Sequence, residues 1–389
     1  MHDKHLAGMS EVMRLTRSGR LREATSAIQR LLRDQPLAPV ANAPAKRTEK
    51  EPMFRVIREE PYRASSAGHV EPSAHRPRPV PGRAPDARGQ FITGSYTNEA
   101  GRRSYKLYVP SGYRGQSLPL VVMLHGCTQD PDDFAAGTRM NRVAEQHPCV
   151  VLYPAQARGA NPSKCWNWFK EGDQCRGRGE PSIVAGITQR IMSSHNIDSQ
   201  RVYVAGLSAG GALAVTMGRT YPDLYAAVGV HSGLAYAVAH DLPSAFAMMR
   251  QDDVAIGRMG IGGARRLIAG EQVVPTIVFH GDRDRTVHPV NGEQVIAQSL
   301  PVSRSGNADP GTKSHVTVER GQAANGHAYT RTIYHDAGGQ PSVEHWLVHG
   351  AGHAWSGGSS DGSFTDPKGP DATREMIRFF WKHSRRAPH

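Results

Sequence analysis

The sequence predicts an α/β fold with a mainly parallel sheet and helices on both of its faces, preceded by a helical hairpin and a disordered linker. From about residue 89 onward, short apolar runs rich in β-branched residues alternate with helical patterns and Gly-rich turns. These runs are apolar along their whole length, which is typical of strands covered on both faces. The chain of 389 residues, with 41 Gly and 27 Pro, has room for one domain of about 300 residues and an appendage.

The N-terminal quarter of the chain differs in composition from the rest. Between residues 9 and 34, apolar side chains recur every three to four positions and are interrupted at Ser18 and Gly19, which predicts a helical hairpin in 1–35. Residues 36–88 contain ten prolines and many Ala, Arg and Ser, and we interpret them as a disordered linker. The α/β domain is then expected to occupy 89–389.

Within that domain, strands and helices are expected to follow one another as βαβ units. The strand candidates are 105–109, 120–124, 150–153, 202–205, 226–231, 276–279 and 343–348, and the helix candidates are 133–147, 182–195, 209–221 and a C-terminal segment around 373–380. The apolar face of the last segment predicts packing against the core.

Positive charge is concentrated at the N-terminus. The net charge is +12, and residues 1–90 carry 17 Lys and Arg against 10 Asp and Glu, while the rest carries 30 against 25. A basic, Pro-rich leader can contact a granule coat or another anionic surface, and a solvated flexible arm fits the same composition. We expect no nucleic-acid partner.

The sequence contains no run of 18 or more apolar residues, so no membrane-spanning helix is expected. The N-terminus lacks the apolar stretch and cleavage site of a secretion signal, which favours a cytoplasmic location. Four cysteines, Cys127, Cys149, Cys165 and Cys175, are too few to build the fold from disulfides. Cys165 and Cys175 are near enough in sequence to close a short loop, and four buried free thiols fit equally well.

A candidate nucleophile lies in the segment Gly206-Leu207-Ser208-Ala209-Gly210. The segment follows an expected strand and precedes an expected helix, which is the context in which a G-x-S-x-G motif forms a strained turn. The glycines let the backbone cross closely on both sides of the serine. The sequence therefore predicts that Ser208 projects its hydroxyl from the C-terminal edge of the sheet.

A serine hydroxyl needs a base and an orienting acid, which in this arrangement come later in the chain with the acid first. Asp282 and Asp284 follow the expected strand at 276–279, where catalytic loops collect in open α/β sheets. We choose Asp284 as the acid because it lies further into the loop. Asp282 is better placed to cap the turn or pair with a nearby arginine.

The candidate base is His353, in a Gly-rich turn after the last expected strand. His345, His349 and His353 recur every four residues, a spacing that could bind a metal ion on a helix. Gly350 and Gly352 argue against a helix there, and no acidic ligand is nearby. We therefore expect neither a metal site nor a cofactor.

Two backbone N–H groups are expected to stabilise the oxyanion of a tetrahedral intermediate. Ala209 follows the nucleophile, and Cys127 follows the strand candidate 120–124, where an oxyanion donor is usually placed. The candidate substrate-binding residues are His125, Trp166 and Trp355, because flat rings supply apolar area at little entropic cost. Packing in the core fits the tryptophans as well, although the position of Trp355 beside the candidate base favours a cleft.

Five segments, 118–129, 165–169, 206–211, 352–358 and 363–367, together resemble the polyhydroxybutyrate depolymerase family of esterases. These are α/β-hydrolases related to feruloyl and acetylxylan esterases, and the resemblance covers about 95–383. It implies Ser208 as nucleophile, His353 as base and Asp284 as acid, without a cofactor.

The resemblance also implies a reaction and a location. The expected function is hydrolysis of short-chain 3-hydroxyalkanoate esters through an acyl-enzyme intermediate, with a feruloyl or acetylxylan esterase as the alternative. A third hypothesis is that the chain is a non-catalytic granule-binding protein on the same scaffold. Many members of the family are secreted, which points to an extracellular location, whereas the N-terminus points to the cytoplasm.

Overall fold

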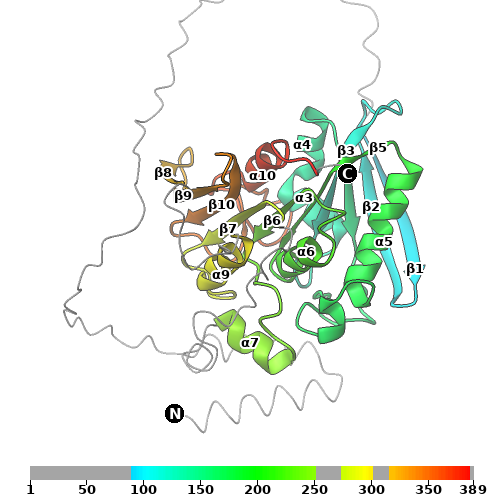
Figure 1. The fold of residues 1–389 in the computed structure, drawn as a ribbon, viewed down its shortest axis with the longest axis horizontal. Helices are drawn as coiled ribbons and strands as arrows, with labels where there is room; N and C mark the ends of the chain where they lie inside the picture. Colours follow the sequence, from blue (N-terminus) through cyan, green and yellow to red (C-terminus); the bar gives the residue numbers. More distant parts are fainter. Residues whose placement is uncertain (1–88, 251–272, 301–314, 386–389) are drawn as a thin grey trace, which may run out of the picture. The chain divides into compact units, whose positions relative to one another are not determined.

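The structure, a computed structural model, describes residues 89–250, 273–300 and 315–385, which belong to one compact unit of the chain (Figure 1). The hairpin expected in 1–35 and the linker expected in 36–88 lie outside the described residues, so both stay predictions. The described residues contain no helix long and apolar enough to cross a membrane.

A ten-stranded sheet runs through the described part of the chain in the order β1-β2-β4-β3-β5-β6-β7-β10-β9-β8. The six strands from β4 to β10 in this order are parallel, and antiparallel pairs extend both edges. The strands are β1 Gln90–Asn98, β2 Gly101–Val109, β3 Leu118–Leu124, β4 Val150–Pro154, β5 Ile197–Leu207, β6 Ala227–His231, β7 Thr276–Gly281, β8 Val316–Gln322, β9 Ala328–His335 and β10 Pro341–Val348.

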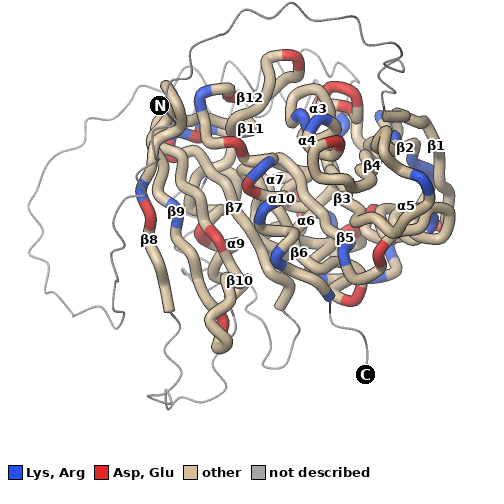
Figure 2. Tube along the Cα trace, turned by 90° about the horizontal axis from the view of Figure 1, so that it is seen from above, with Lys and Arg blue, Asp and Glu red and all other residues tan. Residues whose placement is uncertain are grey.

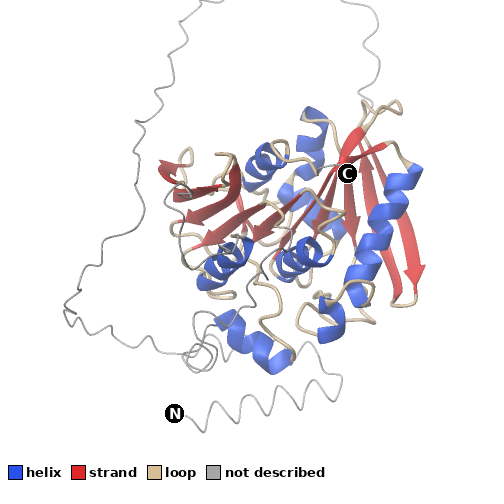
Figure 3. Ribbon diagram, viewed as in Figure 1, coloured by secondary structure: helices blue, strands red, loops and turns tan. Residues whose placement is uncertain are grey.

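Helices cover both faces of this sheet (Figure 3). Along β3, Leu120 and Val122 pack into the core that contains α5 and α6, and Val121 and Met123 pack into the core on the α4 and α10 side. Alternate side chains of a strand point to opposite faces, so a fully apolar strand is needed to fill both cores. The helices are α3 Pro131–Thr138, α4 Met140–Gln146, α5 Gly179–Ser194, α6 Ala209–Thr220, α7 Leu242–Arg250, α9 Val290–Ser299 and α10 Ala372–Phe380.

The structure confirms the expected α/β class and every strand candidate: six lie within somewhat longer strands, and the candidate 226–231 is β6 without its first residue. The single helix expected over 133–147 was wrong, because Arg139 lies between α3 and α4 with a φ of 55°. Its N–H donates to the carbonyl oxygen of Ala135, which ends α3 in the left-handed conformation common at helix C-termini.

Basic and acidic residues are interspersed along the described elements (Figure 2). One buried group of them holds α10 against the sheet. Glu344 of β10 is fully buried, and its carboxylate accepts hydrogen bonds from Arg331 of β9, Arg378 of α10 and the Trp346 indole. Burial alone would raise the pKa of Glu344, but the two guanidinium groups hold it below its usual range. Breaking a buried pair of this kind typically costs about 3–5 kcal/mol.

Candidate active site

Ser208 lies in a sharp turn between β5 and α6, with φ 57° and ψ −120°. Residues with side chains rarely adopt a positive φ, so surrounding contacts must hold the turn. A Cβ on Gly206 would lie 2.3 Å from the carbonyl carbon of Gly210, and a Cβ on Gly210 would lie 2.1 Å from the carbonyl oxygen of Leu124. Both glycines of the motif are therefore sterically required, and the expected strand, turn and helix around Ser208 are confirmed.

The loops that follow β7 and β10 lie side by side because these two strands are parallel neighbours in the sheet. Gly281 at the end of β7 is in register with Val348 at the end of β10. Beyond the strands, the N–H of Asp282 donates to the carbonyl oxygen of Val348 at 3.1 Å, and the N–H of Arg283 donates to that of Ala351 at 3.0 Å. Two segments some 70 residues apart thus meet at the C-terminal edge of the sheet.

Asp284 and His353 are brought into direct contact there. The Oδ2 atom of Asp284 lies 2.7 Å from Nδ1 of His353. Its Oδ1 atom accepts hydrogen bonds from the N–H groups of Thr286 and Val287, each at 2.9 Å. An ionised carboxylate can only accept a hydrogen bond, so Nδ1 of His353 carries the proton in this contact. The Nε2 atom is then the basic nitrogen of the ring.

The carboxyl of Asp284 also lies near a second histidine. Burial alone would raise the pKa of Asp284, but hydrogen bonds from His280 and His353 hold it well below its usual range. Nε2 of His280 is 3.5 Å from the carboxylate and 2.9 Å from the carbonyl oxygen of Val287, so its proton is directed mainly at the carbonyl. We therefore regard His353, at the shorter distance, as the principal partner of Asp284.

Asp282 has a different role. Its Oδ1 atom accepts the N–H of Gly350 at 2.7 Å, and its Oδ2 atom lies 3.0 Å from Nδ1 of His349. The carboxylate therefore links its own turn to the loop after β10 and does not cap its own turn as expected, and its side-chain partner is a histidine and not an arginine. His345 lies in β10 and the other two histidines of the series lie in the loop beyond it, so these residues share no helix.

The Oγ atom of Ser208 forms no hydrogen bond with His353 or with any other residue that the structure describes. Ser208 is nevertheless at the same sheet edge, and its N–H donates to the carbonyl oxygen of His231 at the end of the neighbouring strand β6. Nucleophile and base often stand apart until substrate binds. Asp284 and His353 are thus in direct contact. Ser208 lies at the same C-terminal edge of the sheet but forms no hydrogen bond with the imidazole of His353.

The segment after β3 runs beside the Ser208 turn, since a Cβ built on Gly126 would lie 3.6 Å from that of Ser208. The next residue, Cys127, donates its N–H to no other described residue. Ala209 opens α6, and the first N–H groups of a helix have no partner within it. Both N–H groups are thus suited to bind a negatively charged oxygen near Ser208.

Cys127 forms a disulfide bond with Cys165. The pairing of Cys165 with Cys175 was wrong, and so was the alternative of four free thiols, because Cys175 is exposed and free and only Cys149 is a buried free thiol. The two bonded cysteines are 38 positions apart, but their Cα atoms lie 4.1 Å apart where two loops meet. Spacing along the chain carried no signal for this contact.

The three candidate substrate-binding residues are all buried. Burial lowers the pKa of His125 to about 4, and its neutral ring donates from Nδ1 to the carbonyl oxygen of Gly126 and accepts at Nε2 from the N–H of Gln156. Trp166 packs on that ring, and Trp355 stacks on His231. The structure therefore places them in the packing beneath the site, and direct contact with substrate stays a prediction.

An exposed aromatic ring beside the histidine belongs to Phe364. This residue is 45% exposed, and its ring centre lies 6.5 Å from that of His353 in an edge-to-face arrangement. Its φ of 52° is held by a hydrogen bond from the N–H of Trp355 to the Phe364 carbonyl oxygen at 2.7 Å. Segment 363–367 contributes to the family resemblance of the sequence, but no local pattern in it indicates that Phe364 lies beside His353.

Comparison with known proteins shows what this chain is similar to. Residues 103–322 match the family model described as esterase PHB depolymerase. Over 264 residues, 66% of this chain, the sequence is 33% identical to poly(3-hydroxyalkanoate) depolymerase C of Paucimonas lemoignei. It is 28% identical to poly(3-hydroxybutyrate) depolymerase of Ralstonia pickettii over 64% of the chain, and 31% identical to feruloyl esterase B of Neurospora crassa over 38%.

The matches cover 59%, 50% and 49% of the lengths of these three relatives, so the chain spans about half of the curated proteins that it resembles. Among solved structures, acetyl xylan esterase from Aspergillus awamori matches with a TM-score of 0.53 at 19% identity, covering 75% of this chain and 99% of that one. This similarity confirms the α/β-hydrolase fold.

Proposed function

The chain belongs to the esterase PHB depolymerase family, and on that premise we propose that it is a serine esterase acting on short-chain 3-hydroxyalkanoate esters. The observation that carries the proposal is the 2.7 Å contact between Asp284 and His353 at the sheet edge where Ser208 sits in its strained turn. A buried carboxylate that orients an imidazole beside an exposed edge suits nucleophilic acyl transfer.

The proposed reaction has two halves. Nε2 of His353 takes the proton of Ser208 as Oγ attacks the ester carbonyl, and the N–H groups of Cys127 and Ala209 bind the resulting oxyanion. The intermediate collapses as His353 gives the proton to the departing alcohol, which leaves an acyl-serine. Water, activated by the same imidazole, then attacks the acyl group and releases the acid, while Asp284 keeps the ring oriented and stabilises its positive charge.

The choice of substrate rests on the relatives. The two depolymerases named for hydroxyalkanoate polymers align over about two thirds of this chain, whereas the feruloyl esterase aligns over 38%. Hydroxyalkanoate esters are therefore the first proposal, and feruloyl or acetylxylan esters are the second. The walls of the pocket, and not the catalytic residues, decide between them.

A labelling experiment and a substrate panel test the proposal. The full chain is treated with a biotinylated fluorophosphonate and digested, and the labelled peptide is identified by mass spectrometry; we expect the label on Ser208. Initial rates are then compared for hydroxybutyrate trimer, methyl ferulate and acetylxylan, with the highest kcat/KM expected for the trimer. Absence of label on Ser208 would refute the serine mechanism, and preference for another ester would refute the substrate class.

Phe364 supplies a second prediction. An exposed ring next to the base can contact the apolar part of an ester, and losing such a contact removes about 1 kcal/mol of binding. Phe364→Ala is therefore expected to raise the KM for hydroxybutyrate trimer about 3- to 10-fold with kcat within about 2-fold, while Phe364→Tyr keeps the wild-type KM. Ile92→Ala, on the edge strand β1 and 43% exposed, is the control. An equal KM in the Phe364→Ala and Ile92→Ala variants would exclude the contact.

A further inference from the structure

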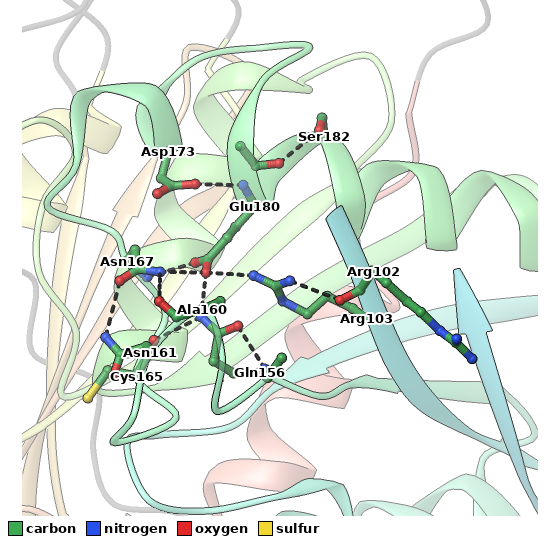
Figure 4. Close-up of polar contacts among 12 residues, drawn as sticks. Arg102, Arg103, Gln156, Ala160, Asn161, Cys165, Asn167, Asp173, Glu180 and Ser182 are labelled. Carbon is green, nitrogen blue, oxygen red and sulfur yellow. Dashed lines mark hydrogen bonds and ion pairs between the residues drawn. The ribbon is translucent and has the colours of Figure 1, made fainter. Parts of the chain in front are cut away.

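Glu180, near the start of α5, lies at the centre of a buried polar cluster (Figure 4). The residue is 2% exposed. Its Oε1 atom accepts hydrogen bonds from Nη2 of Arg103 at 3.2 Å, from Nδ2 of Asn167 at 2.8 Å and from Nε2 of Gln156. Its Oε2 atom accepts the backbone N–H of Asn167 at 2.7 Å. We call Arg103, Gln156, Asn167 and Glu180 the Glu180 cluster.

The cluster is built to hold a negative charge. Moving a carboxylate out of water costs several kcal/mol unless donors and a counter-charge replace the solvent. The contacts to Glu180 are all N–H donors, and Arg103 supplies the positive charge. Burial, with the charge of Asp173 nearby, raises the pKa of Glu180, and these hydrogen bonds oppose that shift. If an NH2 group replaced one carboxylate oxygen of Glu180, it would face an N–H donor of the cluster and could not form the same hydrogen bond.

One arm of the cluster reaches the segment after β3 through Gln156. The side chain of Gln156 is held by Glu180 and also donates to the carbonyl oxygen of Cys165 at 2.9 Å. Its backbone N–H donates to Nε2 of His125 at 3.1 Å. Glu180 thus holds the side chain of Gln156, and the backbone N–H of Gln156 holds the ring of His125. His125 lies two positions before Cys127.

The other arm runs through Asn167, which Glu180 holds by both its backbone and its side chain. The preceding residue, Trp166, donates its indole N–H to the carbonyl oxygen of His125 at 3.1 Å. Cys165 is bonded covalently to Cys127. Both arms therefore end on residues 125–127. The N–H of Cys127, the last of these residues, is free to bind an oxyanion.

We propose that Glu180 is a positioning residue for ester hydrolysis: its buried carboxylate fixes the loops of Gln156 and Asn167, and these hold the Cys127 N–H in place. The inference rests on the proposed esterase function. A preorganised oxyanion donor contributes about 100- to 1000-fold in kcat, and a misplacement of about 1 Å can cost about 100-fold. Glu180 acts only through the residues that it holds.

Glu344 provides a matched control. It too is a buried glutamate that accepts hydrogen bonds from arginine, but its partners lie on β9 and α10. Glu180→Gln and Glu344→Gln both replace a buried carboxylate with an amide of the same shape, and both are expected to lower the melting temperature. Only the first should disturb residues 125–127.

The test uses the full chain at a temperature where circular dichroism shows both variants folded. Glu180→Gln is expected to lower kcat for hydroxybutyrate trimer about 10- to 100-fold with KM within about 3-fold, because the oxyanion contact acts in the transition state. Its rate of fluorophosphonate labelling should fall by a similar factor. Glu344→Gln should stay within about 3-fold of wild type in both assays. Equal kcat values for the two variants would overturn the proposal.

A measurement without mutation covers the case in which Glu180→Gln does not fold. All four cysteines are described and form one disulfide, so dithiothreitol acts on the Cys127–Cys165 bond alone. Reduction breaks the covalent link of the second arm, although the Trp166 hydrogen bond to His125 remains, and is expected to lower kcat at least 5-fold with unchanged KM, with recovery on reoxidation. An unchanged kcat in the reduced enzyme would count against the proposal. A wild-type chain without activity and without label on Ser208 would instead refute the esterase function itself.

Discussion

Replacing Ser208 with alanine is expected to lower kcat for ester hydrolysis by about 10⁴- to 10⁶-fold, because the variant has no oxygen to form the acyl-enzyme. The fold should persist. Alanine has the same Cβ at φ 57°, and the turn is held by the backbone bond from residue 208 to the carbonyl oxygen of His231 and by the close approach of Gly206 and Gly210. Initial rates with hydroxybutyrate trimer, fluorophosphonate labelling and thermal unfolding measure the three consequences.

Ser232 offers a control of the same kind. It is a buried serine at positive φ, one strand away at the end of β6, and its N–H donates to the carbonyl oxygen of Phe279. Ser232→Ala should keep kcat within about 10-fold of wild type and should still take up the label. If Ser208→Ala retained more than a hundredth of the wild-type kcat, another residue would have to be the nucleophile.

The central strands could be predicted from sequence because burial on both faces leaves an unbroken apolar run, as in β3 and β4. The edge strands could not. In β8 most positions are exposed or half-buried, and its mixture of Val, Thr, Glu and Arg resembles a loop in composition. The hairpin of β1 and β2 escaped prediction in part for the same reason, since every position of β1 is exposed or half-buried.

The same distinction applies to the site. The turn that carries Ser208 could be predicted because its motif, strand and helix are contiguous in sequence. The structure places Asp284 and not Asp282 against His353, as position in the loop suggested. The Cys127–Cys165 bond and the Glu180 cluster could not be found, because each joins segments whose proximity depends on the packing of the whole sheet. A buried glutamate near a helix N-terminus looks like any capping residue until its partners are known.

Replacing Asp284 with asparagine is expected to lower kcat by about 10³- to 10⁴-fold. The asparagine carbonyl oxygen can still accept the N–H groups of Thr286 and Val287, so the loop should keep its shape. Its NH2 group would then face Nδ1 of His353 and favour the tautomer with the proton on Nε2, the nitrogen that must take the proton of Ser208. The measurement is kcat and KM with hydroxybutyrate trimer at neutral pH.

The low pKa of Asp284 gives a second readout of the same substitution. A carboxyl whose pKa is depressed on folding stabilises the folded state above its unfolded pKa of about 4, and this stabilisation is lost as the pH falls toward its folded value. The difference in free energy of unfolding between wild type and Asp284→Asn should therefore be largest at neutral pH and smaller at pH 3. Urea denaturation at the two pH values measures it.

Asp282→Asn is the control that separates the two carboxylates of this loop. Asp282 binds His349 and the N–H of Gly350, and both of these partners belong to the loop that carries His353. Its replacement should loosen that loop and lower kcat by less than about 10-fold, since the Asp284–His353 contact remains. A larger loss in Asp282→Asn than in Asp284→Asn would mean that His349, and not His353, is the histidine oriented for catalysis.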